Sequence, residues 1–264
     1  NVEWDRLTEY GHNSRWIRRM ETVALQVVDD VVAVSESDKQ IMQTKGVSPS
    51  FITVIPHGVD VQTIQRGSVH RDHWRKQYRV EDKRVLFFHG TLHYAPNTDA
   101  VRFIATELLP LMMQDAQFDD VVFVVTGMNP PLYYDHPRIV YTGAVDDLAG
   151  HLHMADAFVC PLFAGGGTRL KLLEYLATGK PIVTTQKGAE GIPNQGQFEY
   201  AETAIEFISA ILKVLDEDGA FSQRRGFANR LAWQTVTQEY IRLYQRESYV
   251  RGSNRFDGLL SRPH

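Results

Sequence analysis

Short apolar runs of three to five residues alternate with helical patterns along most of the chain. The runs are continuously apolar, which is typical of strands covered on both faces. Because helical patterns lie between most of the runs, we expect parallel strands joined by right-handed crossovers, with helices on both sides of the sheet. The predicted strands are Val31–Val34, Ile52–Ile55, Val85–Phe88, Val121–Val125, Ile139–Tyr141, Ala157–Cys160 and Ile182–Thr184.

Capping and stop signals define the helices that these crossovers require. Asn97 is expected to cap a helix that runs to about Leu109 and that Pro110 closes. Gly179, with Pro181 two residues later, marks the predicted end of a second helix. The further helices are predicted from Gly167–Thr168 to Gly179, from Ala201 to about Leu215, and within Gln223–Glu247.

A polar and strongly charged stretch, Gln62–Arg84, follows the turn Pro56–Asp60 and predicts a domain junction. The expected fold class is α/β, a Rossmann-like doubly wound parallel sheet preceded by the remnant of a second Rossmann-like domain. The first residue is Asn1 rather than Met, so we expect a piece of a longer protein. The predicted divisions are 1–60 for the remnant, 61–84 for a hinge, 85–220 for the complete domain, 221–250 for terminal helices and 251–264 for a tail.

Charge and cysteine content narrow the class of protein. The formal net charge is −4 and the two signs are interspersed, which argues against a nucleic-acid partner. The single cysteine, Cys160, is expected to be a buried strand residue. One cysteine cannot form an internal disulfide, which fits a reducing compartment. No apolar run reaches the ~18 residues of a membrane span, and no signal peptide is evident. We therefore expect a cytoplasmic location.

Three successive glycines, Gly165–Gly167, lie between a predicted strand and a predicted helix. Without side chains, backbone N–H groups can approach a ligand closely. The start of the following helix, with Thr168 and Leu170, adds unpaired N–H donors and a positive dipole end. The segment predicts an anion site, with phosphate as the commonest ligand, and the alternative is a flexible loop that binds nothing.

The helix after these glycines carries a cation and a carboxylate on one face. Lys171 and Glu174 are about 60° apart around a helix and one turn apart along it. The ammonium would lie near the phosphate, and the carboxylate could accept hydrogen bonds from vicinal hydroxyls such as those of a ribose. The alternative is a solvated i,i+3 ion pair. Arg169 is about 160° from Lys171 and would have to swing toward the anion.

Glycines and small polar residues also follow other predicted strands. Gly90 would permit close approach to a ligand, while Thr91, His93 and Asn97 would supply donors. Such strand ends predict one ligand crevice along the carboxyl edge of the sheet. The segment Lys187–Ile192 could close over that crevice or be only a turn. The scattered histidines lack the partners of a metal site, so no metal is expected.

In their order along the chain, these segments resemble the retaining GT-B glycosyltransferases of family 4, which use sugar nucleotides. The resemblance covers about residues 15–245 and includes Trp233 in the terminal helices. It assigns the complete domain to the sugar-nucleotide donor, as the GT-B C-terminal domain, and the remnant to the acceptor. Its landmarks are Val31–Asp38, Ile52–Asp60, Gly90 with Pro96–Asn97, Gly143–Leu148, Ala155–Ala157 with Pro161, Gly165–Glu174, Gly179–Val183 and Gly188–Gly191.

The resemblance implies a role for each matched residue. Glu174 matches the second glutamate of the family's Glu-x7-Glu pattern, which holds the ribose, whereas Gly166 replaces the first, which contacts the sugar. Asp147 stands near the base, where a carboxylate could accept from guanine. The expected catalytic residues are Lys171, Glu174 and Arg169, and the expected donor-binding residues are Gly90, Thr91, Asn97, Val145, Asp147, Gly165, Gly166, Gly167, Thr168 and Leu170.

The implied activity is retaining transfer of a sugar from a UDP or GDP sugar to a saccharide or lipid-linked acceptor, as in polysaccharide biosynthesis. The resemblance implies no metal or other cofactor, and it leaves room for contact with the inner face of a membrane. Two alternatives stay open. One is a non-catalytic module that binds nucleotide sugars, and the other is a sugar-nucleotide 2-epimerase, for which Glu190 is the obvious candidate carboxylate.

Overall fold

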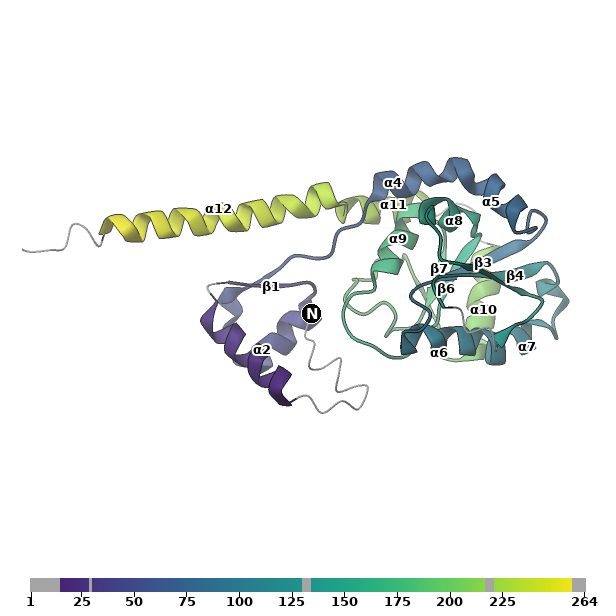
Figure 1. Cartoon of the computed structure of the whole chain (residues 1–264), viewed down its shortest axis with the longest axis horizontal. Coiled ribbons are helices and arrows are strands. Elements are labelled where there is room, and N and C mark those ends of the chain that lie inside the picture. The colour runs from purple at the N-terminus through teal and green to yellow at the C-terminus, as the bar shows by residue number, and fades with distance from the viewer. Residues whose placement is uncertain (1–14, 29, 130–133, 217–220, 258–264) are drawn as a thin grey trace, which may run out of the picture.

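The computed structural model describes residues 15–28, 30–129, 134–216 and 221–257 and contains two parallel sheets (Figure 1). A small sheet pairs β1 with β2, and a larger sheet has the order β5-β4-β3-β6-β7-β8. Every strand pair is parallel, and all seven predicted strands are present. The strands are β1 (Val31–Ala33), β2 (Ile52–Val54), β3 (Arg84–His89), β4 (Val121–Thr126), β5 (Ile139–Gly143), β6 (Ala157–Cys160), β7 (Ile182–Thr184) and the unpredicted two-residue β8 (Glu199–Tyr200).

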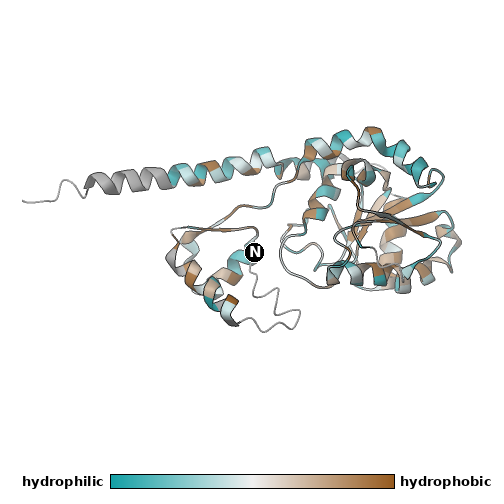
Figure 2. Ribbon diagram, viewed as in Figure 1, coloured by the Kyte–Doolittle hydropathy of each residue, from teal (hydrophilic) through white to brown (hydrophobic). Residues whose placement is uncertain are grey.

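Helices cover both faces of the larger sheet. In Figure 1, α6, α7 and α10 lie on one face, and α4, α5, α8, α9 and α11 lie on the other. The strands between them are the brown, apolar layer of Figure 2, and residues such as Phe87 and Phe158 have no exposed surface. The helices are α2 (Arg15–Val27), α3 (Glu36–Thr44), α4 (Val61–Arg66), α5 (Arg71–Gln77), α6 (Ala95–Phe103), α7 (Leu109–Met112), α8 (Leu148–Met154), α9 (Leu170–Thr178), α10 (Ala204–Leu215), α11 (Phe221–Arg230) and α12 (Trp233–Asp257).

The strand order reverses at β3, which pairs with β4 on one side and with β6 on the other. In a doubly wound sheet, the crossovers on the two sides of such a strand leave the sheet in opposite directions. A crevice is therefore expected beyond the carboxyl ends of β3 and β6, between the loops that follow them. The doubly wound fold class predicted from the sequence is confirmed.

The helix after β3 differs from its prediction at both ends. Tyr94 stands at the cap position, so Asn97 lies inside the first turn of α6 and does not cap it. Pro110 does not end the helix, because a π-helical turn, Ile104–Leu108, absorbs it. There the N–H of Leu109 donates to the carbonyl of Ile104, which relieves the clash that Pro110 would cause in a regular helix.

The predicted end of α9 is confirmed, since Gly179 follows Thr178 in the left-handed conformation with φ 83°. The start is two to three residues later than predicted, with Arg169 at the cap position. The helix α10 begins at a capping box formed by Thr203 and Glu206. The terminal region forms α11 and α12, and α12 continues through residues 251–257, which the sequence predicted as a tail.

The predicted hinge, residues 61–84, is instead a helical part of the larger unit. Its helices α4 and α5 pack against α8, and the side chain of Arg75 is buried against Asp156 at 3.0 Å. The stretch also supplies Val61, Ile64 and Val80 to the main core. Its many charged residues are the reason that composition suggested a linker. The connection to the smaller unit lies just before residue 61, and there the N–H of Val59 donates to the carbonyl of Leu231 at 2.9 Å.

The smaller unit has a core of its own, formed by Val31, Ala33, Met42, Val47 and Ile52. Its strands and the helix α3 follow the Rossmann-like pattern of strand, helix and parallel strand. The prediction for residues 1–14 lies outside the described residues. Within the described ranges, none of the helices combines the length and apolarity that crossing a bilayer requires.

Candidate donor site

A cavity of about 920 Å³ opens at the carboxyl edge of the larger sheet, where the strand order reverses. Its walls are the loops after β3, β4, β5 and β6 together with the first turns of α9. The sequence predicted a ligand crevice along this edge, and the cavity confirms the position of the crevice, while its ligand stays a prediction. The predicted residues that line it are Gly90, Thr91, Asn97, Val145, Gly166, Thr168, Arg169, Leu170, Lys171 and Glu174.

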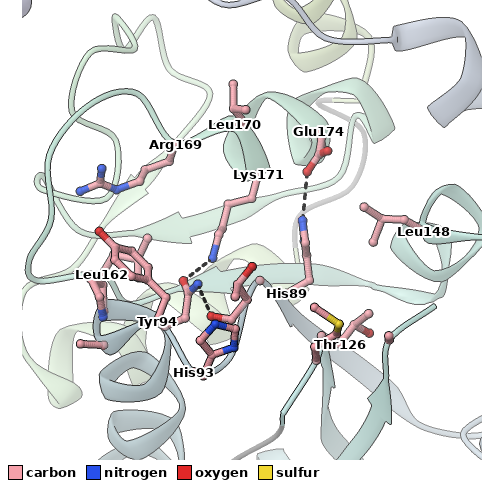
Figure 3. A pocket seen from close by; sticks show the side chains of 18 of the residues that line it. His89, His93, Tyr94, Thr126, Leu148, Leu162, Arg169, Leu170, Lys171 and Glu174 are labelled. Carbon is pink, nitrogen blue, oxygen red and sulfur yellow. Dashed lines mark hydrogen bonds and ion pairs between the residues drawn. The ribbon is translucent and has the colours of Figure 1, made fainter. Parts of the chain in front are cut away.

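Lys171 points from α9 into the cavity (Figure 3). Its Nζ donates to Asn97 Oδ1 at 2.7 Å and lies 4.2 Å from the centre of the Phe88 ring. Burial lowers the pKa of Lys171 to about 8. The ammonium therefore stands in a poorly solvated place with a neutral hydrogen-bond partner, where an incoming anion would meet a strong field.

Asn97 and Gly90 create the space around that ammonium. The side-chain amide of Asn97 donates to the carbonyl of Thr91 at 2.9 Å, so the loop after β3 and α9 are joined through this one residue. A Cβ atom at position 90 would lie 2.7 Å from Asn97 Nδ2 and 2.8 Å from Lys171 Nζ. Glycine leaves room here for these two side chains to meet, and the close approach to a ligand that the sequence predicted stays a prediction.

Glu174 lies one turn further along α9 and pairs with His89, the last residue of β3. Glu174 Oε2 is 3.0 Å from His89 Nε2, and the side chain of Glu174 keeps 29% of its surface exposed to the cavity side (Figure 3). Burial lowers the pKa of His89, against the opposing influence of Glu174. The sequence pattern alone indicated no role for His89.

Arg169 does not point toward the anion site. Its guanidinium donates to the carbonyls of Gly165, Gly166 and Gly167 at 2.5–2.6 Å and to that of Ala164 at 3.3 Å. Arg169 therefore fixes the conformation of the glycine loop just before α9 begins. That conformation includes positive φ angles at Gly165 (97°) and Gly167 (77°), which glycine adopts without strain.

Asp147 also departs from its predicted role near a base. Its carboxylate caps α8 by accepting from the N–H of Gly150 at 2.9 Å, and it accepts from Trp74 Nε1 at 2.7 Å and pairs with His70 Nδ1 at 2.8 Å. Burial raises the pKa of this carboxyl, but these hydrogen bonds outweigh burial and lower it overall. Ala144, Val145 and Leu148 line this end of the cavity, so it is largely apolar.

The loop at Lys187–Ile192 does not line the cavity in the described part of the chain. Gly191 lies against Thr168 and against Ser35 of the smaller unit, and Glu190 Oε2 is 2.9 Å from Lys187 Nζ. The carboxylate of Glu190 is therefore in an ion pair with Lys187. Among the described residues, no three or more His, Cys, Asp or Glu side chains are grouped so that they could hold a metal ion.

The fold and the position of the cavity together define a class. An α/β chain with a six-stranded parallel sheet, a cavity at the strand-order reversal and a second Rossmann-like unit has the GT-B fold. The chain belongs to the group 1 glycosyl transferases. The family model described as "Glycosyl transferases group 1" matches residues 83–217, and that of "Glycosyltransferase Family 4" matches residues 6–63.

Relatives with sequence similarity agree with this assignment. The Bacillus subtilis protein named "Putative glycosyltransferase YtcC" is 29% identical over 208 residues, which are 68% of this chain and 50% of that protein. The phosphatidylinositol N-acetylglucosaminyltransferase GPI3 subunit of Saccharomyces cerevisiae is 27% identical over 235 residues, 78% of this chain and 48% of that protein. The chain thus spans about half the length of these relatives.

Solved structures share the fold at low sequence identity. Alr3699/HepE of Anabaena, in complex with UDP and glucose, superposes with a TM-score of 0.74 at 16% identity, over 91% of this chain and 69% of that one. The sucrose-phosphate synthase of Thermosynechococcus elongatus superposes with a TM-score of 0.70 at 17% identity, over 94% and 66%. These matches support the fold class.

Proposed function

We propose that this chain carries the nucleotide-sugar donor site of a retaining hexosyltransferase. The observation that carries the proposal is the shared orientation of Lys171 and Glu174, which extend from successive turns of α9 into one cavity. The diphosphate of the donor would bind at the start of α9, and Glu174 would accept hydrogen bonds from the ribose hydroxyls. The base would lie beyond the ribose, against Val145 and Leu148.

The chemical step needs the departing diphosphate to be stabilised. The ammonium of Lys171 and the backbone N–H groups at the start of α9 are fixed before the reaction, so they would require little reorganisation when charge develops on the leaving group. We propose that these groups replace a metal ion. Retention would follow if the acceptor attacks from the side of the leaving group, as the family resemblance implies.

The end of the cavity proposed for the base is largely apolar, which favours uracil over guanine. Guanine has two neighbouring N–H groups that could donate hydrogen bonds to one carboxylate. The carboxylate of Asp147, however, already accepts hydrogen bonds from Trp74 and Gly150. A uracil ring needs fewer side-chain partners and fits an apolar wall. That Alr3699/HepE is in complex with UDP is consistent with this preference.

The acceptor would be a saccharide or a lipid-linked saccharide that contacts the smaller unit. The name of the GPI3 subunit points to a phosphatidylinositol acceptor in that relative, which supports an acceptor at a membrane surface. We propose a cytoplasmic location with peripheral contact at the inner face of the membrane. Of the alternatives, a non-catalytic binding module fits the same cavity, whereas the 2-epimerase loses support because Glu190 is not among the residues that line the cavity.

Calorimetry with UDP, GDP and ADP tests the donor site directly. UDP should bind the chain, and Glu174→Ala should weaken binding by about 1–3 kcal/mol, because a charged hydrogen-bond acceptor is lost. The matched control is Glu107→Ala, at the polar surface near α7. If none of the three nucleotides binds at millimolar concentration, the proposal is wrong. Incubation of the full-length protein with a UDP sugar and an acceptor then separates transfer with retention from binding alone.

A further inference from the structure

The pairing of His89 with Glu174 has a consequence that goes beyond a donor site in general. We propose that His89 is a positioning residue that holds one oxygen of the Glu174 carboxylate, so that the other is presented to the ribose hydroxyls of the donor. This inference rests on the proposed function and makes it more specific.

The protonation state of His89 follows from its two ring nitrogens. A carboxylate only accepts hydrogen bonds, so Nε2, which is 3.0 Å from Glu174 Oε2, carries a hydrogen. Nδ1 is buried and has no hydrogen-bond partner among the described residues. A second proton would leave a buried N–H without an acceptor, which is costly. The neutral Nε2–H tautomer therefore fits this site.

The groups that face His89 come from two elements. Burial, with Phe87 and Tyr175 against the ring, is the main cause that lowers the pKa of His89. On α9, Glu174 favours protonation of the imidazole and Lys171 opposes it. Tyr175 also fixes the end of β3, because its hydroxyl accepts from the N–H of His89 at 3.1 Å. The ring is thus held in place by the residue next to Glu174.

A neutral partner matters because Lys171 stands three residues before Glu174 on the same helix. At that spacing an ion pair between them is the ordinary outcome on a helix surface. In this structure Lys171 bonds to Asn97 instead, and Glu174 bonds to His89. Two neutral partners keep the cation and the carboxylate apart, and each retains its charge for a ligand. Glu174 Oε1 makes no hydrogen bond or ion pair within the described residues, and Glu174 is one of the residues that line the cavity.

The test compares two variants and two ligands by calorimetry on the full chain. His89→Phe removes the donor, whereas His89→Gln keeps an N–H near the position of Nε2. The ligands are UDP and its 2′,3′-dideoxy analogue. We expect His89→Phe to weaken UDP about 5- to 20-fold but the dideoxy analogue less than 2-fold. His89→Gln should restore most of the UDP affinity. His73→Phe, on the exposed surface of α5, is the matched control.

A double variant adds a second readout. With Glu174→Ala in place, His89→Phe should cause no further loss of UDP affinity, since His89 acts through the carboxylate. Equal losses for UDP and the dideoxy analogue, or no rescue by His89→Gln, would overturn the inference and make His89 a packing residue. Failure of the unchanged chain to bind either ligand would instead overturn the donor site itself, so the two failures are distinguishable.

Discussion

Lys171 Nζ lies 2.7 Å from Asn97 Oδ1, and this contact joins α9 to the first turn of α6 across the mouth of the crevice. Thr91 and Asn97 on the β3 side of this junction are uncharged. The positive charge at the contact therefore comes from α9. An amide in the first turn of α6 orients that cation without neutralising it.

Replacement of Lys171 by Met should weaken the binding of UDP about 10- to 100-fold, because a charged hydrogen bond to phosphate contributes about 1.5–3 kcal/mol. Uridine, which lacks the phosphates, should bind with unchanged affinity. Calorimetry with both ligands measures the difference. Lys76→Met, at an exposed position of α5, serves as the control. Equal losses for UDP and uridine would mean that Lys171 supports the shape of the cavity and not the phosphates.

The affinity for UDP should also depend on pH through Lys171. Its pKa is lowered to about 8, so the ammonium is present below that pH and is lost as the pH rises through it. A bound diphosphate favours the charged form, so the affinity should be constant up to about pH 7.5 and then fall by up to tenfold per pH unit. UDP is fully ionised over this range, because the second phosphate pKa is about 6. The Lys171→Met variant should show no such fall.

Arg169→Lys should loosen the glycine loop. A lysine cannot reproduce the planar fork that reaches the carbonyls of Gly165, Gly166 and Gly167. We expect a loss of about 1–3 kcal/mol in the free energy of unfolding. Limited proteolysis should cut between residues 163 and 169 faster than in the unchanged chain. Arg102→Lys, at a half-exposed position of α6, is the control. Unchanged proteolysis and stability would show that the carbonyls of the loop are satisfied without Arg169.

The parts of the site that the sequence predicted correctly are those set by local pattern. Continuous apolar runs located the strands, and the glycine segments before α6 and α9 located the cavity, because both depend on neighbours in the sequence. Gly90 and Gly166 line that cavity, whereas their contact with a ligand stays a prediction. Local pattern thus fixes where the cavity lies and which helix supplies its charged residues.

The errors arise where the partner of a side chain is distant or is a backbone atom. Asp147 was expected to read a base, but its partner Trp74 is 73 residues away in the sequence. Arg169 was expected near the anion, but it satisfies carbonyls that only the folded loop brings together. His89 was passed over because it ends a continuously buried strand, where no alternation of polar and apolar residues marks the side that faces a ligand.

Asp147→Ala should cost stability and leave base preference unchanged. The variant removes the cap of α8 and leaves the indole N–H of Trp74 without its acceptor, so we expect a loss of about 1–2 kcal/mol in the free energy of unfolding. Thermal unfolding measures this loss, and calorimetry with UDP and GDP measures the ratio of their affinities. A selective loss of GDP binding would restore the role near guanine that the sequence suggested. Asp99→Ala, at an exposed position of α6, is the control.

Gly90→Ala should narrow the cavity at its centre with little effect on the fold. The backbone of Gly90 does not have the positive φ that would exclude alanine, so the strain is confined to the contacts of the new methyl group. That group would meet Asn97 Nδ2 at 2.7 Å and Lys171 Nζ at 2.8 Å, and both side chains would have to move away from the place where they meet. Since the proposed contact of Lys171 with the phosphates is made from that place, UDP affinity should fall about tenfold while uridine affinity changes little. Gly226→Ala, where an added Cβ meets nothing within 4 Å, provides the control. If Gly90→Ala binds UDP as the unchanged chain does, the phosphates lie away from the junction of β3, α6 and α9.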